Sequence, residues 1–322
     1  MAKKILAALL IAAMVLSLTS CGGGSKGKLV GIAQYAPHPA LDASAQGFKD
    51  ALKDAGFVEG TNITYEEQNA QGDQANCVTI ANTMQSKNPD LVLTIATPIA
   101  QAVAKVITDK PVLITAVTDP VDAKLVASIE QPGGNVTGTS DLTPVAAQVA
   151  LIKEAIPGIK TVGVMYCSSE PNSKIQADMA IEACESTGLA YQEFTVSAAN
   201  EINLVAQSMI GKVEAVYIPT DNLLAENMKV VSGVTNPEGL PIIVGESGMV
   251  ANGGIFTLGI DYYKLGYQTG EMAAKILKGE ADPATMPIEY QSQYDISYNS
   301  KVAAEVGITL PDSILAGTDL AE

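Results

Sequence analysis

Lys28-Leu-Val-Gly-Ile-Ala33 is a short apolar run, and a similar run, Lys160-Thr-Val-Gly-Val-Met165, returns 132 residues later. Each run is followed by a loop and then by a helical pattern, in which apolar residues recur every three or four positions. The first helical pattern ends at Gly56 and the second at Gly188. A buried strand, a loop and an amphipathic helix that stops at glycine give this pattern. The sequence therefore predicts the same strand-loop-helix unit twice.

Two further pairs of segments extend the repeat. Asp90-Leu-Val-Leu-Thr-Ile-Ala-Thr-Pro98 resembles Glu214-Ala-Val-Tyr-Ile-Pro-Thr-Asp-Asn222, and Lys110-Pro-Val-Leu-Ile-Thr115 resembles Leu240-Pro-Ile-Ile-Val-Gly245. Three matching units in the same order predict two lobes of similar topology. Chance likeness is the alternative, because any parallel sheet contains strand-turn-helix units of this kind.

Strands alternate with helical patterns through the first half of the chain. Strands are expected at 29–33, 63–67, 91–95 and 112–116, and helices at 41–55, 74–86, 99–107 and 121–129. Such alternation is typical of a parallel sheet with both faces covered by helices. The predicted fold class is α/β, with two similar Rossmann-like lobes whose parallel sheets are flanked by helices.

Three segments are expected to cross between the lobes. An extended segment at 136–140 follows a Pro-Gly-Gly turn, residues 256–260 lead into a helix at 263–277, and residues 288–297 are extended again. Three crossings would join two rigid bodies through a three-segment hinge. The expected lobes are residues 28–139 with 260–288, and residues 140–259 with 289–322.

The start of the chain has the pattern of a lipoprotein signal. Lys3-Lys4 precedes an apolar run from Ile5 to Leu16, and Leu18-Thr-Ser-Cys21 follows. The run is too short to span a bilayer, so we expect a signal peptide at 1–20 and a lipid on the thiol of Cys21. An ordinary cleaved signal with a chance cysteine is the alternative. Residues 21–27 would form a flexible tether, and the body would lie outside the cytoplasm, lipid-anchored to the cell membrane or on the periplasmic side of a diderm envelope.

Composition argues against nucleic acid as a partner and against most catalysis. The formal charge is −16, or −18 once Lys3 and Lys4 are removed (−16 − 2), and no basic stripe is present. All 19 basic residues are lysines, so no guanidinium can clamp a carboxylate. His38 is the only histidine, which excludes a multi-histidine metal site and leaves Ser168 or Ser247 with one candidate base. We expect that the protein is not an enzyme and that it binds neither a metal nor a cofactor.

The candidate ligand site lies where strands end and helices begin, because open parallel sheets bind ligands outside the carboxyl ends of their strands. Free helix amides at these turns can hold a carboxylate without arginine. The candidate ligand-binding residues of the first lobe are Tyr35, His38, Ala96, Thr97, Thr118 and Asp119. Those of the second lobe are Ser168, Ser169, Asn172, Asp221, Asn222, Glu246 and Ser247. Together these groups predict a site for a zwitterion.

The two charged ends of a zwitterion are assigned to different residues. Thr97, nearby amides and Ser168 or Ser169 are expected to hold the carboxylate. Asp221 or Glu246 is expected to hold the ammonium group, since each supplies the opposite charge.

Each polar candidate has a structural alternative. Four of them stand where a helix N-cap is needed, namely Thr97, Asp119, Ser168 and Asp221. Capping and ligand contact are compatible, because both use the same helix end. Glu246 is less easily explained as a cap.

The loop aromatics Tyr35 and His38 are expected to line the pocket for the ligand side chain, or else to cover their own loop. The tyrosines at 262, 263 and 267 are expected to pack in the hinge and the core, and less readily to touch a ligand.

Several motifs together resemble those of one family. They are Pro39-Ala-Leu-Asp42 with Gly47-Phe48, Ala96-Thr-Pro98, Ala116-Val-Thr-Asp-Pro-Val121, Pro132-Gly-Gly-Asn-Val-Thr-Gly138 and Pro219-Thr-Asp-Asn222. Over nearly the whole chain after Cys21 they are similar to the substrate-binding lipoproteins of ABC transporters assigned to tryptophan and tyrosine uptake. The resemblance implies a type I periplasmic-binding-protein fold that closes on tryptophan, tyrosine or phenylalanine and delivers it to a membrane permease.

The expected partners are an amino acid, the permease of an ABC importer and, through the lipid anchor, the membrane; the protein is expected to be a monomer. A sensor lipoprotein that reports ligand occupancy would use the same fold. An importer subunit for another small zwitterion, such as a branched-chain amino acid, would use the same site. A DNA-binding repressor is opposed by the secretion signal and by the lack of a basic helix-turn-helix segment before Lys28.

Overall fold

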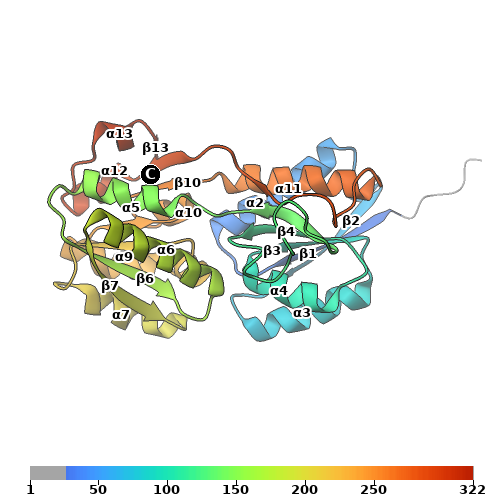
Figure 1. Cartoon of the computed structure of the whole chain (residues 1–322), viewed down its shortest axis with the longest axis horizontal. Coiled ribbons are helices and arrows are strands. Elements are labelled where there is room, and N and C mark those ends of the chain that lie inside the picture. The colour runs from blue at the N-terminus through green and yellow to red at the C-terminus, as the bar shows by residue number, and fades with distance from the viewer. Residues whose placement is uncertain (1–26, 322) are drawn as a thin grey trace, which may run out of the picture.

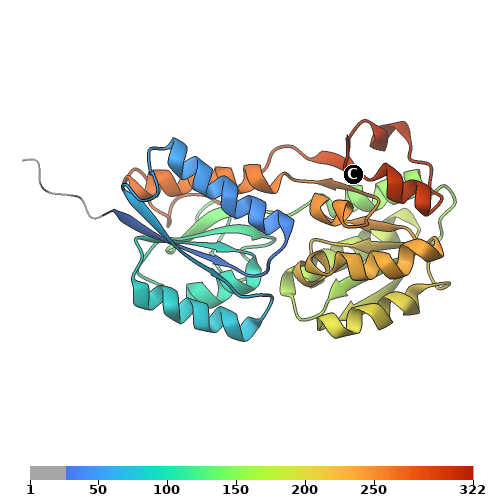
Figure 2. The same cartoon turned by 180° about the vertical axis from the view of Figure 1, so that it is seen from behind.

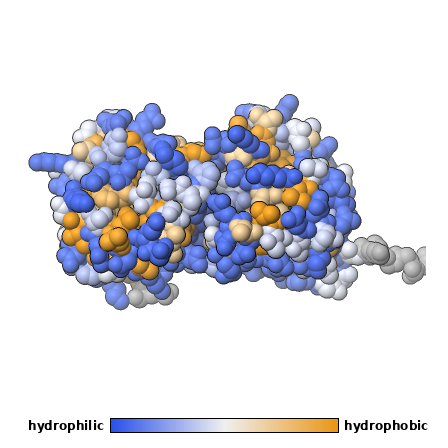
Figure 3. Space-filling view, turned by 90° about the horizontal axis from the view of Figure 1, so that it is seen from below, coloured by the Kyte–Doolittle hydropathy of each residue, from blue (hydrophilic) through white to orange (hydrophobic). Residues whose placement is uncertain are grey.

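The computed structural model describes residues 27–321 as two lobes that lie side by side (Figures 1 and 2). Each lobe contains one sheet with helices on both faces. Seen from below, the lobes are two rounded bodies with a clear boundary between them, and hydrophilic residues cover most of this face (Figure 3). The predicted signal peptide, Cys21 and most of the predicted tether lie outside the described residues. Within 27–321 no helix is both long enough and apolar enough to cross a membrane.

The first sheet has the strand order β11-β5-β4-β3-β1-β2, and all neighbouring strands are parallel. Its strands are β1 (Lys28–Gln34), β2 (Ile63–Asn69), β3 (Leu91–Ile95), β4 (Val112–Val117), β5 (Val136–Ser140) and β11 (Glu289–Tyr290). The central strands β3 and β4 are buried throughout, because helices cover both faces. One face carries α2 (Pro39–Asp54) and α11 (Tyr262–Leu277), and the other α3 (Gln74–Lys87) and α4 (Thr97–Val106).

The second sheet has the order β13-β12-β10-β9-β8-β6-β7, in which only the β10–β12 pair is antiparallel. Its strands are β6 (Thr161–Cys167), β7 (Ala190–Val196), β8 (Ala215–Ile218), β9 (Ile242–Val244), β10 (Phe256–Gly259), β12 (Asp295–Tyr298) and β13 (Thr318–Asp319). Its helices are α5 (Val145–Ala155), α6 (Pro171–Thr187), α7 (Ile202–Met209), α8 (Asn222–Glu226), α9 (Met228–Thr235), α10 (Ser247–Ala251), α12 (Ser300–Glu305) and α13 (Asp312–Leu315).

The two sheets repeat one topology. The order β2-β1-β3-β4-β5 in the first lobe corresponds strand for strand to β7-β6-β8-β9-β10 in the second. The predicted fold class, two similar α/β lobes with parallel sheets, is confirmed. In such sheets the order reverses between the first and third strands, and the crevice at that point is where ligands bind. Both crevices face the boundary between the lobes.

Three segments cross between the lobes: residues 141–144, 260–261 and 291–294. Gln291 joins the last two, since its Nε2 donates a hydrogen bond to the Asp261 carbonyl at 2.5 Å and its Oε1 accepts one from the Asp261 amide at 3.1 Å. The strand pairing of β11 with β5 puts residues 289–290 and Ser140 in the first sheet. These residues therefore lie one or two positions beyond the boundaries expected from the sequence.

Helices α2 and α11 are in direct backbone contact along one face of the first lobe (Figure 2). A Cβ added at Gly47 would lie 2.0 Å from the Tyr263 carbonyl oxygen, and one added at Gly266 would lie 1.9 Å from the Ser44 carbonyl oxygen. Only glycine allows this approach, because any side chain at either position would collide with the facing backbone. The helix that leaves the hinge is thus packed rigidly on the first helix of the lobe.

The helix predicted at 121–129 is wrong. The segment consists of turns, in which Asp119 accepts hydrogen bonds from the amides of Val121 and Asp122 at 2.9 Å each. Lys124 has a φ of 59°, a left-handed conformation that ends any right-handed helix. The apolar spacing in this segment reflects packing of its turns against the lobe, and not a helical face.

Candidate ligand site between the lobes

A small enclosed cavity lies between the lobes at the carboxyl ends of their strands. Its volume is about 20 Å³, room for roughly one water molecule. The residues that line it from the first lobe and the hinge are His38, Leu41, Ala116, Thr118, Asp141 and Tyr262. Those that line it from the second lobe are Asn172, Thr220, Asp221, Asn222, Ala225 and Glu246. The cavity therefore occupies the position at which the fold predicts a ligand.

Two of the lining carboxylates cap short helices of the second lobe. Asp221 accepts hydrogen bonds from the amides of Cys167 at 2.6 Å and Leu224 at 2.8 Å, and so caps α8. Glu246 accepts from the amides of Gly248 at 2.5 Å and Met249 at 2.8 Å, and so caps α10. The expectation that Glu246 is less easily a cap is wrong, because a helix of five residues leaves no periodic pattern in the sequence.

Glu170 is a third fixed carboxylate directly behind the lining. Its side chain is 1% exposed and accepts hydrogen bonds from the Leu223 amide at 3.0 Å and from Asn222 Nδ2 at 2.6 Å. It therefore ties the start of α6 to the start of α8, two elements far apart in the sequence. Backbone amides thus orient all three second-lobe carboxylates before any ligand arrives.

Burial raises the pKa of every carboxyl group around the cavity. The pKa of Asp141 rises to about 6 and that of Glu246 to about 7, in both cases chiefly through loss of hydration. Burial also raises the pKa of Asp221 and of Glu170, and the neighbouring Asp221 charge adds to the rise at Glu170. None of the described residues that line the cavity is a lysine. These carboxyl groups need either protons or a bound cation when the lobes are closed.

The first lobe holds its carboxylate differently. Tyr262 donates its hydroxyl to Asp141 Oδ2 at 2.8 Å, and Thr118 donates to Asp141 Oδ1 at 3.3 Å. The Thr118 hydroxyl also accepts a hydrogen bond from Gln176 Nε2 of the second lobe at 3.2 Å. The same Gln176 amide donates to Thr220, so it links the two sides of the closed cleft.

His38 joins the lobes and leaves one ring nitrogen unused. Its Nε2 lies 3.3 Å from Asn222 Oδ1, and Asn222 directs its own Nδ2 to Glu170, so Nε2 is the donor in this pair. Burial lowers the pKa of His38, which favours the neutral ring with Nδ1 as an acceptor. Among the described residues, His38 Nδ1, Asn172 Oδ1 and Thr97 Oγ1 are buried without a hydrogen-bond partner. Two of these three atoms are acceptors, which suits a ligand that brings donors.

Six of the predicted ligand residues come together in the cavity lining: His38, Thr118, Asn172, Asp221, Asn222 and Glu246. Two others lie close by without lining it. Thr97 is the first residue of α4 and 3% exposed, and Ala96 immediately before it has a φ of 87°. Ala116, which does line the cavity, also has a positive φ, of 54°. Such strain is costly for a residue other than glycine and occurs most often at functional sites.

The other predicted ligand residues direct their side chains elsewhere. Tyr35 donates its hydroxyl to the Gly72 carbonyl at 2.9 Å, and Asp119 caps its own turn. Ser168 donates to the Val196 carbonyl at 3.2 Å, Ser169 donates to the Ser197 carbonyl at 3.3 Å, and Ser247 lines a separate groove near the hinge. In the closed arrangement of the lobes, the hydrogen bonds of these hydroxyls and of the Asp119 carboxylate stay within their own lobes.

Four groups at the site were not among the predicted ligand residues: Asp141, Glu170, Thr220 and Tyr262. Glu170 and Thr220 belong to the turns at strand ends, which was the available signal. Asp141 follows directly on the crossing strand β5, and Tyr262 begins α11 directly after another crossing. A search for polar residues at the hinge crossings, in addition to strand ends, would have found both.

Comparison with known proteins decides the family. The family of ABC transporter substrate-binding proteins matches residues 29–320. The chain belongs to this family. This substrate-binding protein is 43% identical over 256 residues to a tyrosine-binding protein of Clostridioides difficile, a match that covers 80% of the present chain and 74% of the relative.

Two solved structures bear on the arrangement of the lobes. The substrate-binding protein is similar to a Streptococcus pneumonia ABC domain in complex with L-Trp, with a TM-score of 0.87, 38% identity and coverage of 91% of this chain and 98% of the other. It is also similar to the ligand-free, open structure of a Clostridium difficile substrate-binding protein with adhesive properties, with a TM-score of 0.70, 42% identity and the same coverages. The lobe arrangement is therefore closer to that of the L-Trp complex.

Proposed function

We propose that this substrate-binding protein captures an aromatic amino acid, L-tyrosine, L-tryptophan or L-phenylalanine, in the cavity between its lobes. The observation that carries the proposal is the set of buried carboxyl groups around the cavity with no lysine in its lining. An ammonium group would supply the missing positive charge, and Asp221, Glu246 and Asp141 are placed to receive it. The tyrosine-binding and L-Trp-bound relatives support an aromatic side chain.

The carboxylate end of the ligand is assigned to the first lobe. Thr97 has a buried hydroxyl without a partner at the start of α4, a helix of ten residues. Pro98 has no N–H, so the Thr97 hydroxyl and the amides of Thr97 and Ile99 form the anion-binding group, which needs no arginine. Ser168 and Ser169 stand across the boundary and remain candidates for the same end of the ligand.

Binding requires the lobes to separate. Small-molecule sites in proteins measure roughly 300–1,000 Å³, whereas the closed cavity measures about 20 Å³. Rotation at the three crossings would open the cleft, admit the amino acid and let both lobes close on it with loops adjusted around its side chain. The ligand favours the closed form because only that form contacts it from both sides.

The protein acts as a carrier and not as an enzyme. His38 is engaged with Asn222, and neither Ser168 nor Ser247 is hydrogen-bonded to it, so the one available base does not activate a nucleophile. We assign the protein to the outside of the cytoplasmic membrane, as a monomer anchored through lipid on Cys21. From there the closed form would deliver its amino acid to the permease of an ABC importer.

Calorimetric titration of residues 22–322 with each of the twenty amino acids tests the proposal. Saturable binding of tyrosine, tryptophan or phenylalanine is expected, and a flat response to all three would refute it. Preference for leucine or valine would instead favour a branched-chain importer subunit. Two analogues of tyrosine locate the charges: 3-(4-hydroxyphenyl)propionate lacks the ammonium group and tyramine lacks the carboxylate. Loss of the ammonium group is expected to weaken binding more than loss of the carboxylate, because carboxyl groups line the cavity.

A further inference from the structure

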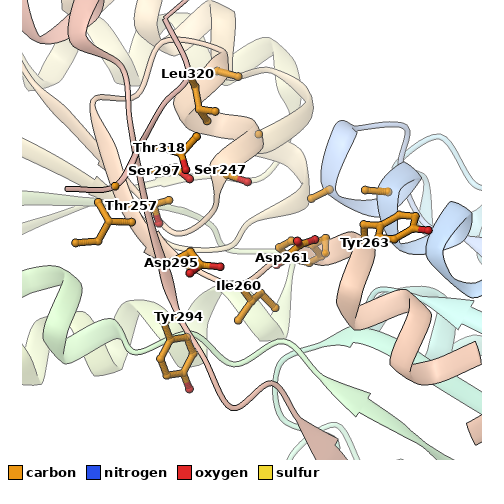
Figure 4. A pocket seen from close by; sticks show the side chains of 18 of the residues that line it. Ser247, Thr257, Ile260, Asp261, Tyr263, Tyr294, Asp295, Ser297, Thr318 and Leu320 are labelled. Carbon is orange, nitrogen blue, oxygen red and sulfur yellow. The ribbon is translucent and has the colours of Figure 1, made fainter. Parts of the chain in front are cut away.

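A second and larger hollow lies beside the hinge, outside the ligand cavity. We call it the hinge groove (Figure 4); its volume is about 780 Å³. The start of α2 and the start of α11 line it from the first lobe, and α10, β10, β12 and the chain before the C-terminus line it from the second. Tyr262 lines both the hinge groove and the ligand cavity. A molecule in the hinge groove would therefore touch both lobes without entering the ligand cavity.

Three hydroxyls form a row along one wall of the hinge groove. Thr257 on β10 pairs with Ser297 on β12, and Ser297 pairs with Thr318 on β13. Directly paired residues of neighbouring strands point to the same face of a sheet, with Cβ atoms about 5 Å apart. The row runs from the buried Thr257, which is 1% exposed, to the exposed Thr318 at the mouth. Figure 4 shows Ser247 of α10 beside Ser297 and Thr318.

The most buried hydroxyl of the row is not used by the described part of the protein. Thr257 Oγ1 is buried without a hydrogen-bond partner among the described residues. A buried hydroxyl without a partner costs free energy and marks a position where an additional group is accommodated. Gly259, two residues along the same strand, leaves space next to it, since a Cβ at that position would lie 3.4 Å from Thr257 Oγ1. The wall is thus polar, and the absence of a side chain at Gly259 lets a ligand approach the Thr257 hydroxyl closely.

The charges of the hinge groove disfavour anions. Asp295 lies on the same face of β12 as Ser297, two residues away, and is exposed. Across the groove, Asp261 forms an ion pair with Lys264, at 3.2 Å between Oδ2 and Nζ, so the one lysine of the lining is neutralised. The carboxylate of Asp295 therefore sets the charge of the wall, and it accepts hydrogen bonds from a ligand.

We propose that the hinge groove is a second binding site, for a neutral polyhydroxylated molecule of the size of a mono- or disaccharide. A row of hydroxyls beside a carboxylate matches the alternating donors and acceptors of vicinal hydroxyl groups, and the Tyr263 ring lines the opposite side (Figure 4). Because such an occupant contacts both lobes, it stabilises one lobe arrangement and changes the affinity of the ligand cavity. By linkage, the cavity ligand changes the affinity of the hinge groove by the same factor.

Titration of the wild-type protein with maltose, and separately with glucose, tests this proposal. Putrescine and inorganic phosphate serve as cationic and anionic probes. Saturable binding of at least one sugar is expected, with a dissociation constant that shifts at least twofold when the amino acid found for the ligand cavity is present. Thr257→Val removes the buried hydroxyl at nearly constant volume, and sugar binding is expected to weaken about tenfold.

Two further variants keep the test decisive. Ala251→Phe fills the exposed side of the hinge groove and is expected to abolish sugar binding. Ala304→Phe places the same ring at an exposed position of α12, outside the groove lining, and is expected to leave sugar binding unchanged. Folding is checked for each variant by circular dichroism, independently of any ligand. Absence of saturable sugar binding to the wild type, or binding of putrescine alone, would overturn the proposal. So would sugar binding that persists in Ala251→Phe. None of these outcomes depends on which amino acid enters the cavity.

Discussion

The two lobes have the same strand order but bring different chemistry to the cleft between them. The second lobe supplies carboxylates that backbone amides hold in place, at Glu170, Asp221 and Glu246. The first lobe supplies groups that are tied only by side chains or not at all, namely Asp141, held by two hydroxyls, and Thr97 and His38 with unpartnered atoms. The second lobe is preorganised for a cation, whereas free hydrogen-bonding atoms remain on both sides, at Thr97 and His38 of the first lobe and at Asn172 of the second. A duplicated fold thus carries an asymmetric site.

The largest change in ligand affinity is expected when a carboxylate of the second lobe is removed. Asp221→Ala removes a carboxylate that faces the cavity, and we expect the affinity for the amino acid to fall about 100-fold or more, since a buried ammonium would lose its partner. The variant also loses the α8 cap, at about 1 kcal/mol of folding stability. Calorimetry and thermal unfolding measure the two effects.

Asp73→Ala is the matched control for Asp221→Ala. It removes the cap of α3, where Asp73 accepts from the amides of Ala75 and Asn76, and Asp73 does not line the cavity. We expect a similar loss of stability with unchanged affinity. Equal losses of affinity in the two variants would mean that Asp221 acts only as a cap.

The next effect concerns pH. The raised pKa values of Asp141, about 6, and Glu246, about 7, mean that these groups take up protons when the empty cleft closes. This contribution to the closed form is complete below the ordinary carboxyl pKa near 4 and is lost as pH rises through about 6 to 7. We expect the open-to-closed ratio of the empty protein to increase at least tenfold from pH 5 to pH 8.

Small-angle scattering of the empty protein at pH 5 and pH 8 measures this change as a larger radius of gyration at pH 8. Saturating amino acid is expected to reduce the difference, because its ammonium group replaces the protons. A radius of gyration that is independent of pH in the empty protein would contradict the claim that the cavity carboxyl groups need protons or a bound cation when the lobes close.

In the first lobe, we expect a substitution that weakens ligand binding without lowering the stability of the fold. Thr97→Val removes a buried hydroxyl that has no partner, so the melting temperature is expected to stay constant or rise. Affinity for the amino acid is expected to fall about fivefold, because one carboxylate contact is lost. Thr94→Val is the control, since Thr94 donates to the Leu113 carbonyl at 3.2 Å and its loss should lower stability alone. Unchanged affinity in Thr97→Val would remove Thr97 from the site.

The smallest changes in ligand affinity are expected at predicted ligand residues whose side chains form hydrogen bonds within their own lobe. Asp119→Asn and Ser168→Ala should each change affinity less than twofold, because Asp119 caps its turn and Ser168 donates to the Val196 carbonyl. A loss of tenfold or more in Ser168→Ala would show that the liganded cleft differs from this closed form. It would also support the ligand role that the sequence predicts for this serine.

The fold could be predicted because it depends on local and repeated patterns. The strand at Leu29–Ala33, its loop and its amphipathic helix leave a periodic signature, and the second copy near Lys160 reports the lobe duplication. Elements shorter than one or two turns leave no such signature, which is why α10 and the cap role of Glu246 were missed. The segment at 121–129 has helical spacing, but a left-handed residue within it stops the helix.

The site could be predicted only in part, for a different reason. Turns at strand ends indicate which residues face the cleft, and Asp221, Asn222 and Glu246 follow from that rule. Which of them meet depends on how the lobes close, and the hydrogen bond between His38 and Asn222 joins residues 184 positions apart. The contacts that bury Glu170 and Asp141 likewise come from segments far apart in the sequence, Asn222 and Leu223 for Glu170 and Tyr262 for Asp141.

The side-chain-free contact between α2 and α11 has a mechanical consequence. Helix α11 begins at the 260–261 crossing and α2 begins at Pro39, directly after His38, so the backbone contacts at Gly47 and Gly266 couple the crossing rigidly to His38. A small rotation at residues 260–261 therefore moves α11, α2 and the His38 imidazole together. Gly266→Ala would separate α11 from α2 and so weaken the coupling between the crossing and His38, although it replaces no residue of the cavity lining.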